Sequence, residues 1–466
     1  MPGVTFRSAT SLAEVIQRKE LSSLEVIDAH LAQIERANPA LNALVRVFAD
    51  AARQRAREAD EALARGESHG PFHGVPMTVK DAWELAGAPS TGGTIGRANH
   101  IPERDATVIA LMRAAGAIPI GMTNVPELSL AFESDNLIYG RTNNPWDPAR
   151  TPGGSGGGGA AAVAAGMSAV EIGADLGGGI RLPSHFCGIA GLRLTNGRAP
   201  LTGYFPPALG WPVHFSASGP MARRVADLEA ACFVIFGPDW IDSHVHDVPI
   251  LRMAAGVQGL RIAVHTNNGI MPARADVAAA VMTAARTLAD AGALVEEAVP
   301  PEIAQCLDLL LGVATADRGD GMRALLAMAG TDRSHPYLDA MLAMGKEHKS
   351  AGFVNGLWIQ VDLYRGQMLA FLRNYDLILC PVQALPAIEH GTWLNGDVFP
   401  GFSYTVAYNL TGWPAAVVRC GTSPEGLPIK VQAVARPWRE DVALTVAQHL
   451  ETALGGYQQP PLPAGA

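Results

Sequence analysis

The 466-residue chain has few cysteines and no long run of charge of one sign. Its five cysteines are scattered singly, at Cys187, Cys232, Cys306, Cys380 and Cys420. No pair has zinc-ligand spacing and the number is odd, which favours a reducing, cytoplasmic location over a disulfide framework. The net charge is −9 and no basic cluster is present, so we expect neither nucleic acid nor an anionic membrane surface as a partner.

Long apolar segments are also missing. No run of about 18 apolar residues occurs, so no membrane span is expected, and the first ten residues lack the apolar core of a signal peptide. Hydrophobic residues make up 48% of the chain and charged residues 17%, which is enough to bury a large core. Since no internal repeat and no clear linker is visible, we interpret residues 1–466 as a single domain.

The order of the segments predicts an α/β fold. Apolar runs typical of strands occur at 75–82, 118–124, 169–175, 293–300 and 375–380, and helical patterns occur among them at 107–117, 160–166 and 275–292. Such alternation predicts a mixed sheet with helices packed against it.

A helical segment is expected at residues 1–66. Ser22 and Glu25 have the spacing of a capping box, and the amphipathic pattern at 24–37 follows them directly. Residues 48–65, rich in Ala, Arg and Glu, predict a second helix. We interpret this pair as scaffold, and we expect a more variable helical region at 240–370.

Two glycine-rich turns dominate the centre of the chain. Residues 153–157, with Ser155 in the middle, precede a helix, and residues 176–179 follow the strand 169–175. Glycine lets the backbone take positive φ and lets a ligand approach the amide groups closely. Consecutive N–H groups in such turns form a concave anion site. An oxyanion hole needs this arrangement, because its donors must lie where negative charge develops.

The same stretch offers a second interpretation. Gly154, Gly156 and Gly159 have the spacing of a dinucleotide fingerprint, and Asp175 lies near the place of the ribose-binding acid. That fingerprint requires a strand directly before the first glycine. Residues 144–152 contain three prolines, which disfavour a buried strand. These prolines argue against the fingerprint, and a nucleotide-binding protein is kept as the third hypothesis, behind the two given below.

Two other patterns resemble sites. His244 and His246 have the alternate spacing of metal ligands on a strand, but no third ligand is evident, and a solvated loop is the preferred interpretation. Cys187 lies close to His185 in the sequence, yet buried free cysteines are common. We therefore predict no metal site and no cysteine nucleophile.

Landmarks along nearly the whole chain resemble the amidase signature family. They include GVPMTVKD at 74–81, TPGGS at 151–155, GADLGGGIRLPSHFCGIAGLR at 173–193, NLTGWPA at 409–415 and GLPIKVQAVARP at 426–437. The segments TNVPELS and FESDNLIYG are similar to those of the fatty acid amide hydrolase branch. The resemblance implies a mixed central β-sheet covered by helices on both sides, and amide hydrolysis by a Ser–cis-Ser–Lys triad without a cofactor.

The resemblance also implies roles for single residues. A lysine takes a proton through a serine in a cis peptide, and a second serine attacks the amide carbonyl. Lys80 matches the lysine, which must be neutral, and Ser155 matches the bridging serine. Asp175 and Arg181 are expected to brace the second turn. The backbone N–H groups of that turn are expected to form the oxyanion hole, at Leu176, Gly177, Gly178 and Gly179.

Gly179 stands where the family has the nucleophilic serine. Glycine has no hydroxyl, so no acyl-enzyme forms there, and loss of a nucleophile costs around a million-fold in one serine protease. Gly156, Gly159 and Ala174 also depart from the polar residues common at their positions. Ser184, five residues later, is not expected to substitute for the missing hydroxyl.

Two hypotheses lead from this departure. The first is an amide hydrolase that is strongly impaired because it lacks its nucleophile. The second is a natural pseudoenzyme that binds a carbonyl ligand or a protein partner. The expected ligand is a small amide, ester or carbamate with an apolar part, and a homodimer is a common assembly. Tyr204, Phe205 and Trp211, in the segment 201–212, either line its pocket or pack as a surface loop.

Overall fold

The computed structural model describes residues 3–462, and within that range the strands form one sheet of eleven. Their order across the sheet is β1-β3-β2-β4-β6-β5-β10-β11-β9-β7-β8. The strands are β1 (Leu44–Val47), β2 (Pro76–Lys80), β3 (Ile118–Thr123), β4 (Val170–Asp175), β5 (Ala190–Arg193), β6 (Ala217–Ala222), β7 (Arg261–Val264), β8 (Leu294–Glu297), β9 (Leu377–Pro381), β10 (Ala415–Thr422) and β11 (Pro428–Ala435). Strand β2 is parallel to β3 and β4, and β7 is parallel to β8 and β9. The other neighbours are antiparallel, so the predicted mixed sheet is confirmed.

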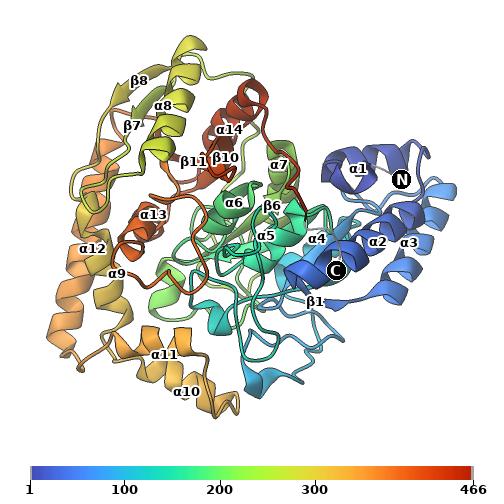
Figure 1. Ribbon diagram of the computed structural model, residues 1–466, viewed down its shortest axis with the longest axis horizontal. Coiled ribbons are helices and arrows are strands. Elements are labelled where there is room, and N and C mark those ends of the chain that lie inside the picture. Colours follow the sequence, from blue (N-terminus) through green and yellow to red (C-terminus); the bar gives the residue numbers. More distant parts are fainter. Residues whose placement is uncertain (1–2, 463–466) are drawn as a thin grey trace.

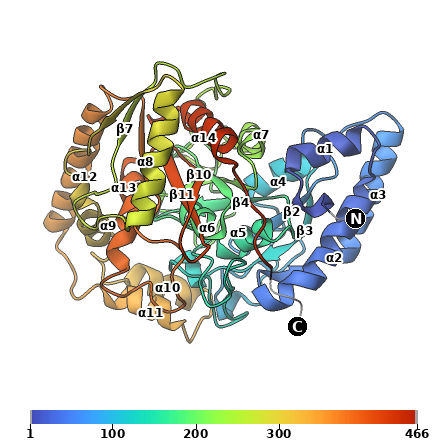
Figure 2. The same ribbon diagram turned by 45° about the horizontal axis from the view of Figure 1, so that its top comes forward.

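The described residues also form fourteen α-helices. They are α1 (Ala9–Gln17), α2 (Ser23–Leu41), α3 (Ala49–Ala64), α4 (Thr107–Ala114), α5 (Gly157–Ala164), α6 (Arg181–Cys187), α7 (Val225–Ile235), α8 (Ala275–Asp290), α9 (Cys306–Ala314), α10 (Asp320–Met328), α11 (Pro336–Ala343), α12 (Ala351–Phe371), α13 (Ser403–Thr411) and α14 (Glu440–Leu454). Figures 1 and 2 show α1 to α3 at one end and α8 and α12 at the other, with α5 and α6 near the centre. The glycine-rich centre of the sequence is thus also central in the fold.

Helices cover both faces of the sheet, as the alternation along β9 shows. Leu377 and Leu379 pack in the same core as residues of α8 and α14. Ile378 and Cys380, which point to the opposite face, pack with residues of α9, α12 and α13. Every residue of β9 is buried, because a strand covered on both faces has no solvent side.

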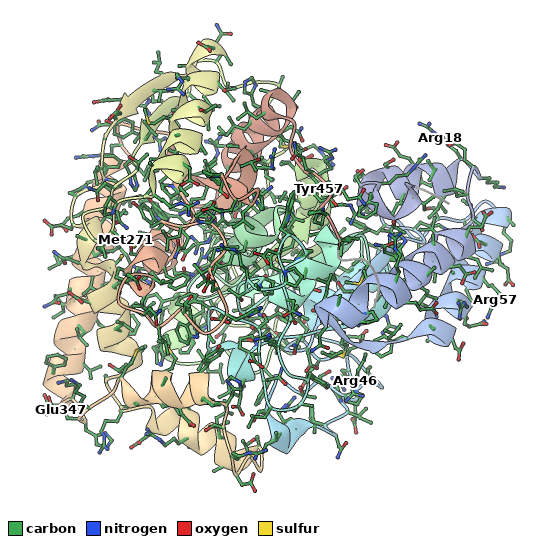
Figure 3. The ribbon with its side chains drawn as sticks, viewed as in Figure 1. Arg18, Arg46, Arg57, Met271, Glu347 and Tyr457 are labelled. Carbon is green, nitrogen blue, oxygen red and sulfur yellow. The ribbon has the colours of Figure 1, made fainter. Side chains whose placement is uncertain are left out.

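The two expected N-terminal helices are present. Ser22 caps α2 by accepting from the Glu25 backbone N–H, and the Glu25 side chain accepts from the Ser22 backbone N–H, so the predicted capping box is confirmed. Helix α3 has nearly the same bounds as the helix expected at 48–65. Figure 3 shows Arg18 and Arg57 on the outer side of this helical end, away from the sheet.

Helix α5 consists of small residues, and all eight are buried. A side chain at Gly158 would overlap the backbone N and O atoms of Asn124, so only glycine permits this close approach. Helix α5 packs on β2, β4 and β6, which brings the loop before it over the end of β2. This contact fixes the relative positions of the two candidate catalytic groups, Lys80 and Ser155.

Residues 240–370 contain strands as well as helices. An irregular stretch ends before β7, and β7, α8 and β8 add to the edge of the sheet before the helices α9 to α12 follow. Over residues 3–462, no helix combines the length and the apolar character that a membrane crossing requires.

Candidate active site

Lys80 is the last residue of β2, and its side chain is fully buried. Met77 and Val79 pack into the main hydrophobic core, so Lys80 points to the opposite face, where α5 lies. Its amino group contacts two hydroxyls and makes no ion pair with a carboxylate of the described residues. The two hydroxyls are therefore the polar partners of this buried amino group.

Ser155 lies in the loop that leads into α5. Lys80 Nζ and Ser155 Oγ form a hydrogen bond of 2.8 Å, although 75 residues separate them. The Gly154–Ser155 peptide bond is cis. A side chain on Gly154 would overlap the backbone of Ala131 and Glu133, so the glycine lets this loop lie against its neighbour. The loop thereby holds the Ser155 hydroxyl against the lysine.

Tyr204 is the second partner of the lysine. Lys80 Nζ donates to the Tyr204 hydroxyl at 2.9 Å, and this hydroxyl donates to Ser129 Oγ at 3.0 Å. The tyrosine is held in place because Phe205 N donates to the Ala82 carbonyl oxygen at 2.7 Å. The sequence left Tyr204 open between a pocket lining and a surface loop, and it missed the contact with Lys80.

The turn that follows β4 is built around a buried ion pair. Arg181 donates to both carboxylate oxygens of Asp175, at 2.9 and 3.0 Å, and both side chains are fully buried. Asn409 Nδ2 donates to the same carboxylate at 2.8 Å. Burial alone would raise the pKa of Asp175, but the Arg181 and Arg193 guanidinium groups hold it well below its usual range. The carboxylate is therefore charged, and it fixes the turn.

The four backbone N–H groups of the turn are not equivalent. Gly178 N donates to Asp175 Oδ1 at 2.9 Å, so this amide is used by the turn itself. Within residues 3–462, the amides of Leu176, Gly177 and Gly179 have no acceptor. Three donors therefore remain for a negatively charged ligand atom.

Position 179 is crowded even without a side chain. A Cβ atom on Gly179 would stand 2.8 Å from Ser155 Oγ and still closer to the carbonyl oxygen of Ala174. Gly156 N donates to the carbonyl oxygen of Gly179 at 3.0 Å, which ties the two glycine-rich turns together. The Ala174 carbonyl and Ser155 occupy the space beside Gly179, so glycine fits this turn and a larger residue requires movement.

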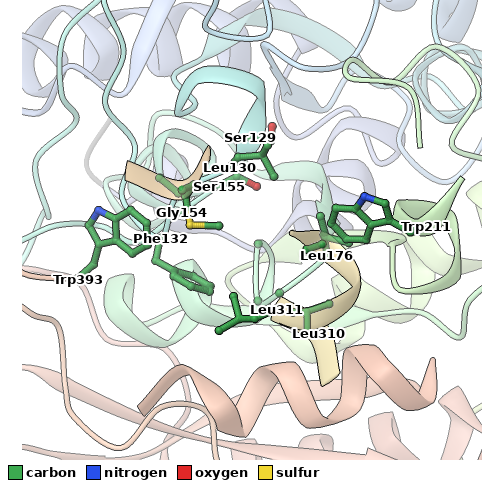
Figure 4. A pocket seen from close by; sticks show the side chains of 16 residues that line it. Ser129, Leu130, Phe132, Gly154, Ser155, Leu176, Trp211, Leu310, Leu311 and Trp393 are labelled. Atoms are coloured by element: carbon green, nitrogen blue, oxygen red, sulfur yellow. The ribbon is translucent and has the colours of Figure 1, made fainter. Parts of the chain in front are cut away.

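Two apolar pockets meet at Ser155. The larger has a volume of about 90 Å³ and the smaller about 40 Å³, and both also border Ser129, Leu130 and Leu176. Figure 4 shows the larger pocket with Ser155 on its wall, among the side chains of Phe132, Trp211, Leu310, Leu311 and Trp393. Neither pocket is bordered by a charged side chain of the described residues. The site therefore suits an uncharged group on both sides of the reacting atom.

The aromatic residues of the segment 201–212 differ in their contact with these pockets. Tyr204 borders the smaller pocket and Trp211 the larger. Phe205 borders neither, because its ring lies beneath the Arg97 guanidinium at 3.8 Å from the ring centroid. The pocket interpretation of this segment thus holds for two of its three aromatic residues.

Comparison with known proteins agrees with this geometry. The family profile described as Amidase matches residues 25–444. The chain belongs to the amidase family. Members of this family are amide hydrolases that act on C–N bonds.

Two curated relatives illustrate the range of this family. Fatty-acid amide hydrolase 2-A from Danio rerio is 32% identical over 97% of this chain and 90% of its own length. A glutamyl-tRNA(Gln) amidotransferase subunit from Synechococcus sp. (strain CC9605) is 32% identical over 94% of both chains. Among solved structures, 6-aminohexanoate cyclic dimer hydrolase has a TM-score of 0.87 and 28% identity, over 98% of this chain and 99% of its own.

The remaining sequence candidates do not join the amidase site. His246 lies against Trp438, at 5.9 Å between ring centroids, whereas His244 lies near His214, so the two imidazoles do not share a ligand position. Burial raises the pKa of the Cys187 thiol, whose Sγ contacts the Pro152 carbonyl oxygen at 3.5 Å.

The polar side chains of two other candidates, Ser184 and the Asp175 of the dinucleotide fingerprint, are bound within the fold. Ser184 Oγ donates to the Ile180 carbonyl oxygen at 2.8 Å, close to its own helix. The dinucleotide fingerprint lacks its preceding strand, because the residues before Gly154 are irregular. Asp175, the expected ribose ligand, is bound by Arg181 instead. The fingerprint interpretation is therefore wrong.

A buried carboxyl group near Lys80 was not anticipated. Glu171 lies on β4 beside Thr78 of β2, and its Oε2 accepts from the hydroxyls of Thr78 and Thr123 at 2.7 and 2.9 Å. Its other oxygen, Oε1, has no partner among the described residues, and the carboxyl group fills the space that a side chain on Gly159 would take. Burial raises the pKa of Glu171 to about 7. The only sequence signal was an acidic residue between apolar neighbours in a predicted strand.

Proposed function

We propose that this site is built for hydrolysis of an amide bond by the Ser–cis-Ser–Lys chemistry, and that Gly179 leaves the chain strongly impaired in it. Lys80 accepts a proton through Ser155, and the residue at position 179 would supply the nucleophile. The observation that carries the proposal is the 2.8 Å hydrogen bond between Lys80 and Ser155, placed where two apolar pockets meet. A neutral lysine beside a hydroxyl is a suitable general base.

The second turn supports the same proposal. The free amides of Leu176, Gly177 and Gly179 are positioned to stabilise the oxyanion of a tetrahedral intermediate. Asp175 and Arg181 act as supports, because their ion pair holds the turn rigid. The Gly178 amide already donates to Asp175, so in this proposal it stabilises the turn and does not bind the oxyanion directly.

The pockets indicate the substrate class. Phe132, Trp211 and Trp393 give the larger pocket an apolar lining that suits an alkyl or aryl group. No charged side chain of the described residues is available to bind a carboxylate or ammonium group there. The proposed substrate is therefore an uncharged amide, ester or carbamate with an apolar part.

A natural pseudoenzyme is the second candidate function. The observation that favours it is the crowding at Gly179, where a side chain would require the Ala174 carbonyl or Ser155 to move. Such a protein would bind a carbonyl ligand through the three free amides without cleaving it. Gly156 and Gly159 fit this interpretation, because both replace polar residues common in the family.

One comparison separates the two candidates. The native chain, Gly179→Ser and Gly179→Ala are assayed on chromogenic anilides, esters and carbamates with acyl chains of increasing length. Gly179→Ala is the matched control, since it adds the same Cβ without the hydroxyl. We expect Gly179→Ser to exceed both other forms by about a thousandfold or more. A folded Gly179→Ser form that is no faster than Gly179→Ala on every substrate would contradict the hydrolase proposal and favour the pseudoenzyme.

A further inference from the structure

Four polar side chains form a continuous chain beside the pockets. Ser155 contacts Lys80 at 2.8 Å, Lys80 contacts Tyr204 at 2.9 Å, and Tyr204 contacts Ser129 at 3.0 Å. Ser129 and Ser155 both border the two pockets, so both ends of this series of hydrogen bonds face the place of a bound ligand. Tyr204 joins this chain from a segment outside both glycine-rich turns.

We propose that Ser155 is itself the nucleophile of a slow hydrolysis in this chain, with Lys80 as general base and Tyr204 as the group that returns the proton to the leaving atom. This inference rests on the proposed function, because it uses the same pockets and the same oxyanion donors. It differs from the Ser–cis-Ser–Lys arrangement, in which the serine at this position only relays a proton.

Ser155 is accessible because it lies on the wall of both pockets. A Cβ on Gly179 would stand 2.8 Å from Ser155 Oγ, so a serine at this position would crowd the hydroxyl that we propose as nucleophile. The neighbouring Gly156 also has no side chain. A carbonyl group is therefore free to approach Ser155 directly. Gly177 and Gly179, whose amides have no acceptor among the described residues, also border the larger pocket.

The proposed reaction starts from a neutral Lys80. In that state the lone pair of Lys80 Nζ would accept from the Ser155 hydroxyl across the 2.8 Å contact, while one of its N–H groups donates to Tyr204 and Tyr204 donates to Ser129. No carboxylate of residues 3–462 forms an ion pair with Lys80. The acidic neighbour Glu171 is instead hydrogen-bonded by two threonine hydroxyls.

The reaction balances within these groups. Ser155 Oγ bonds to the carbonyl carbon while its proton passes to Lys80 Nζ, and the oxyanion is held by the turn amides. The bond from carbon to the leaving atom then breaks. The leaving nitrogen takes a proton from Tyr204, which is resupplied by Lys80, and an acyl ester remains on Ser155. Water attacks this ester, gives a proton to Lys80, and Ser155 Oγ leaves and regains that proton.

Covalent labelling tests the nucleophile directly. The native chain is incubated with excess 4-nitrophenyl butyrate, quenched with acid, and analysed by peptide mass spectrometry. We expect one butyryl group per chain, on the peptide that contains Ser155, no label on that peptide in Ser155→Ala, and about a hundredfold slower labelling in Lys80→Met. Labelling at Ser129, Ser184 or a cysteine, or labelling that persists in Ser155→Ala, would overturn the inference.

The leaving group tests the role of Tyr204. Nitrophenolate leaves without a proton, whereas an aniline nitrogen must be protonated. Tyr204→Phe should therefore slow cleavage of 4-nitrobutyranilide by about a hundredfold and change acylation by the nitrophenyl ester less than about threefold. Equal losses on both substrates would assign Tyr204 a merely structural role.

The serine-restored form separates this inference from the proposed function. If Gly179→Ser is labelled and active while the native chain is never labelled, the inference fails and the proposed function stands. If neither form reacts with ester or anilide, both fail.

Discussion

The hydroxyl of Ser155 lies 2.8 Å from the point where a side chain on Gly179 would begin. The carbonyl oxygen of Ala174 is nearer still, so this point is enclosed by polar atoms. Real Cβ atoms do not approach other atoms so closely, and a substitution at 179 must move the backbone. The glycine is therefore part of the packing of the turn.

Gly179→Ala should destabilise the folded chain. Forcing a methyl group into a closed site costs about 1–3 kcal/mol of unfolding free energy. The control is Gly177→Ala in the same turn, where the added atom would stand 3.5 Å from the Phe132 ring, an ordinary contact. Urea unfolding of the three proteins should show a loss for Gly179→Ala only, and equal stabilities would contradict the packing argument.

Asp175→Asn should unfold far more easily than the native chain. The substitution leaves the buried guanidinium groups of Arg181 and Arg193 without their counter-charge, and breaking such a buried pair costs about 3–5 kcal/mol. Asp320→Asn, which removes an exposed pair with Arg323, is the control and should cost less than about 1 kcal/mol. Thermal unfolding at pH 7 measures both.

The Asp175 carboxylate should also make the stability of the folded chain fall at acid pH. The folded-state pKa of Asp175 is lowered, so its stabilising contribution is present above the unfolded value of 3.8 and is lost as the pH falls toward the folded value. Asp175→Asn should therefore lose less stability than the native chain between pH 5 and pH 3. A parallel loss in both proteins would remove Asp175 from the acid transition.

Local patterns sufficed for much of the fold. The capping box at Ser22 and Glu25 specified the start of α2, since both of its bonds are made within four residues. The apolar run before Pro381 specified β9, because a fully buried strand needs side chains without polar groups on either face. The landmark motifs likewise placed Lys80 and Ser155.

Contacts between segments that are distant in the sequence could not be predicted from it. Tyr204 meets Lys80, 124 residues away, because an isolated bridge pairs Tyr204 with Trp83, just after β2. Glu171 fits only because Gly159, on another element, leaves a space for its carboxyl group. The use of the Gly178 amide by Asp175 depends on the detailed path of the turn, which a glycine-rich sequence does not specify.

Glu171→Gln should flatten the pH dependence of stability. The folded-state pKa of Glu171 is raised to about 7 from 4.5, so the native chain loses stability as the pH rises between these values. A shift of that size corresponds to about 3 kcal/mol. Asp81, whose pKa burial also raises to about 7, contributes equally to both proteins and cancels in the difference.

The measurement is the unfolding free energy in urea at pH 5 and pH 8. The native chain should lose more stability between the two than Glu171→Gln does, and Glu297→Gln, at an exposed position, should behave as the native chain. If Glu171→Gln loses as much as the native chain, the carboxyl group is already ionised at pH 5.

Leu310→Ala should change the preferred acyl length. Leu310 borders the larger pocket, and removing its branched end makes room for additional methylene groups of a substrate. One methylene in an apolar pocket is worth about 1–3 kcal/mol, or roughly tenfold or more in kcat/KM. In the Gly179→Ser background, the ratio of kcat/KM for octanoyl over butyryl anilide should therefore rise about tenfold. Leu363→Ala, on the exposed face of α12, is the control and should leave the ratio unchanged. An unchanged ratio in Leu310→Ala would place the acyl chain in the smaller pocket, beside Tyr204.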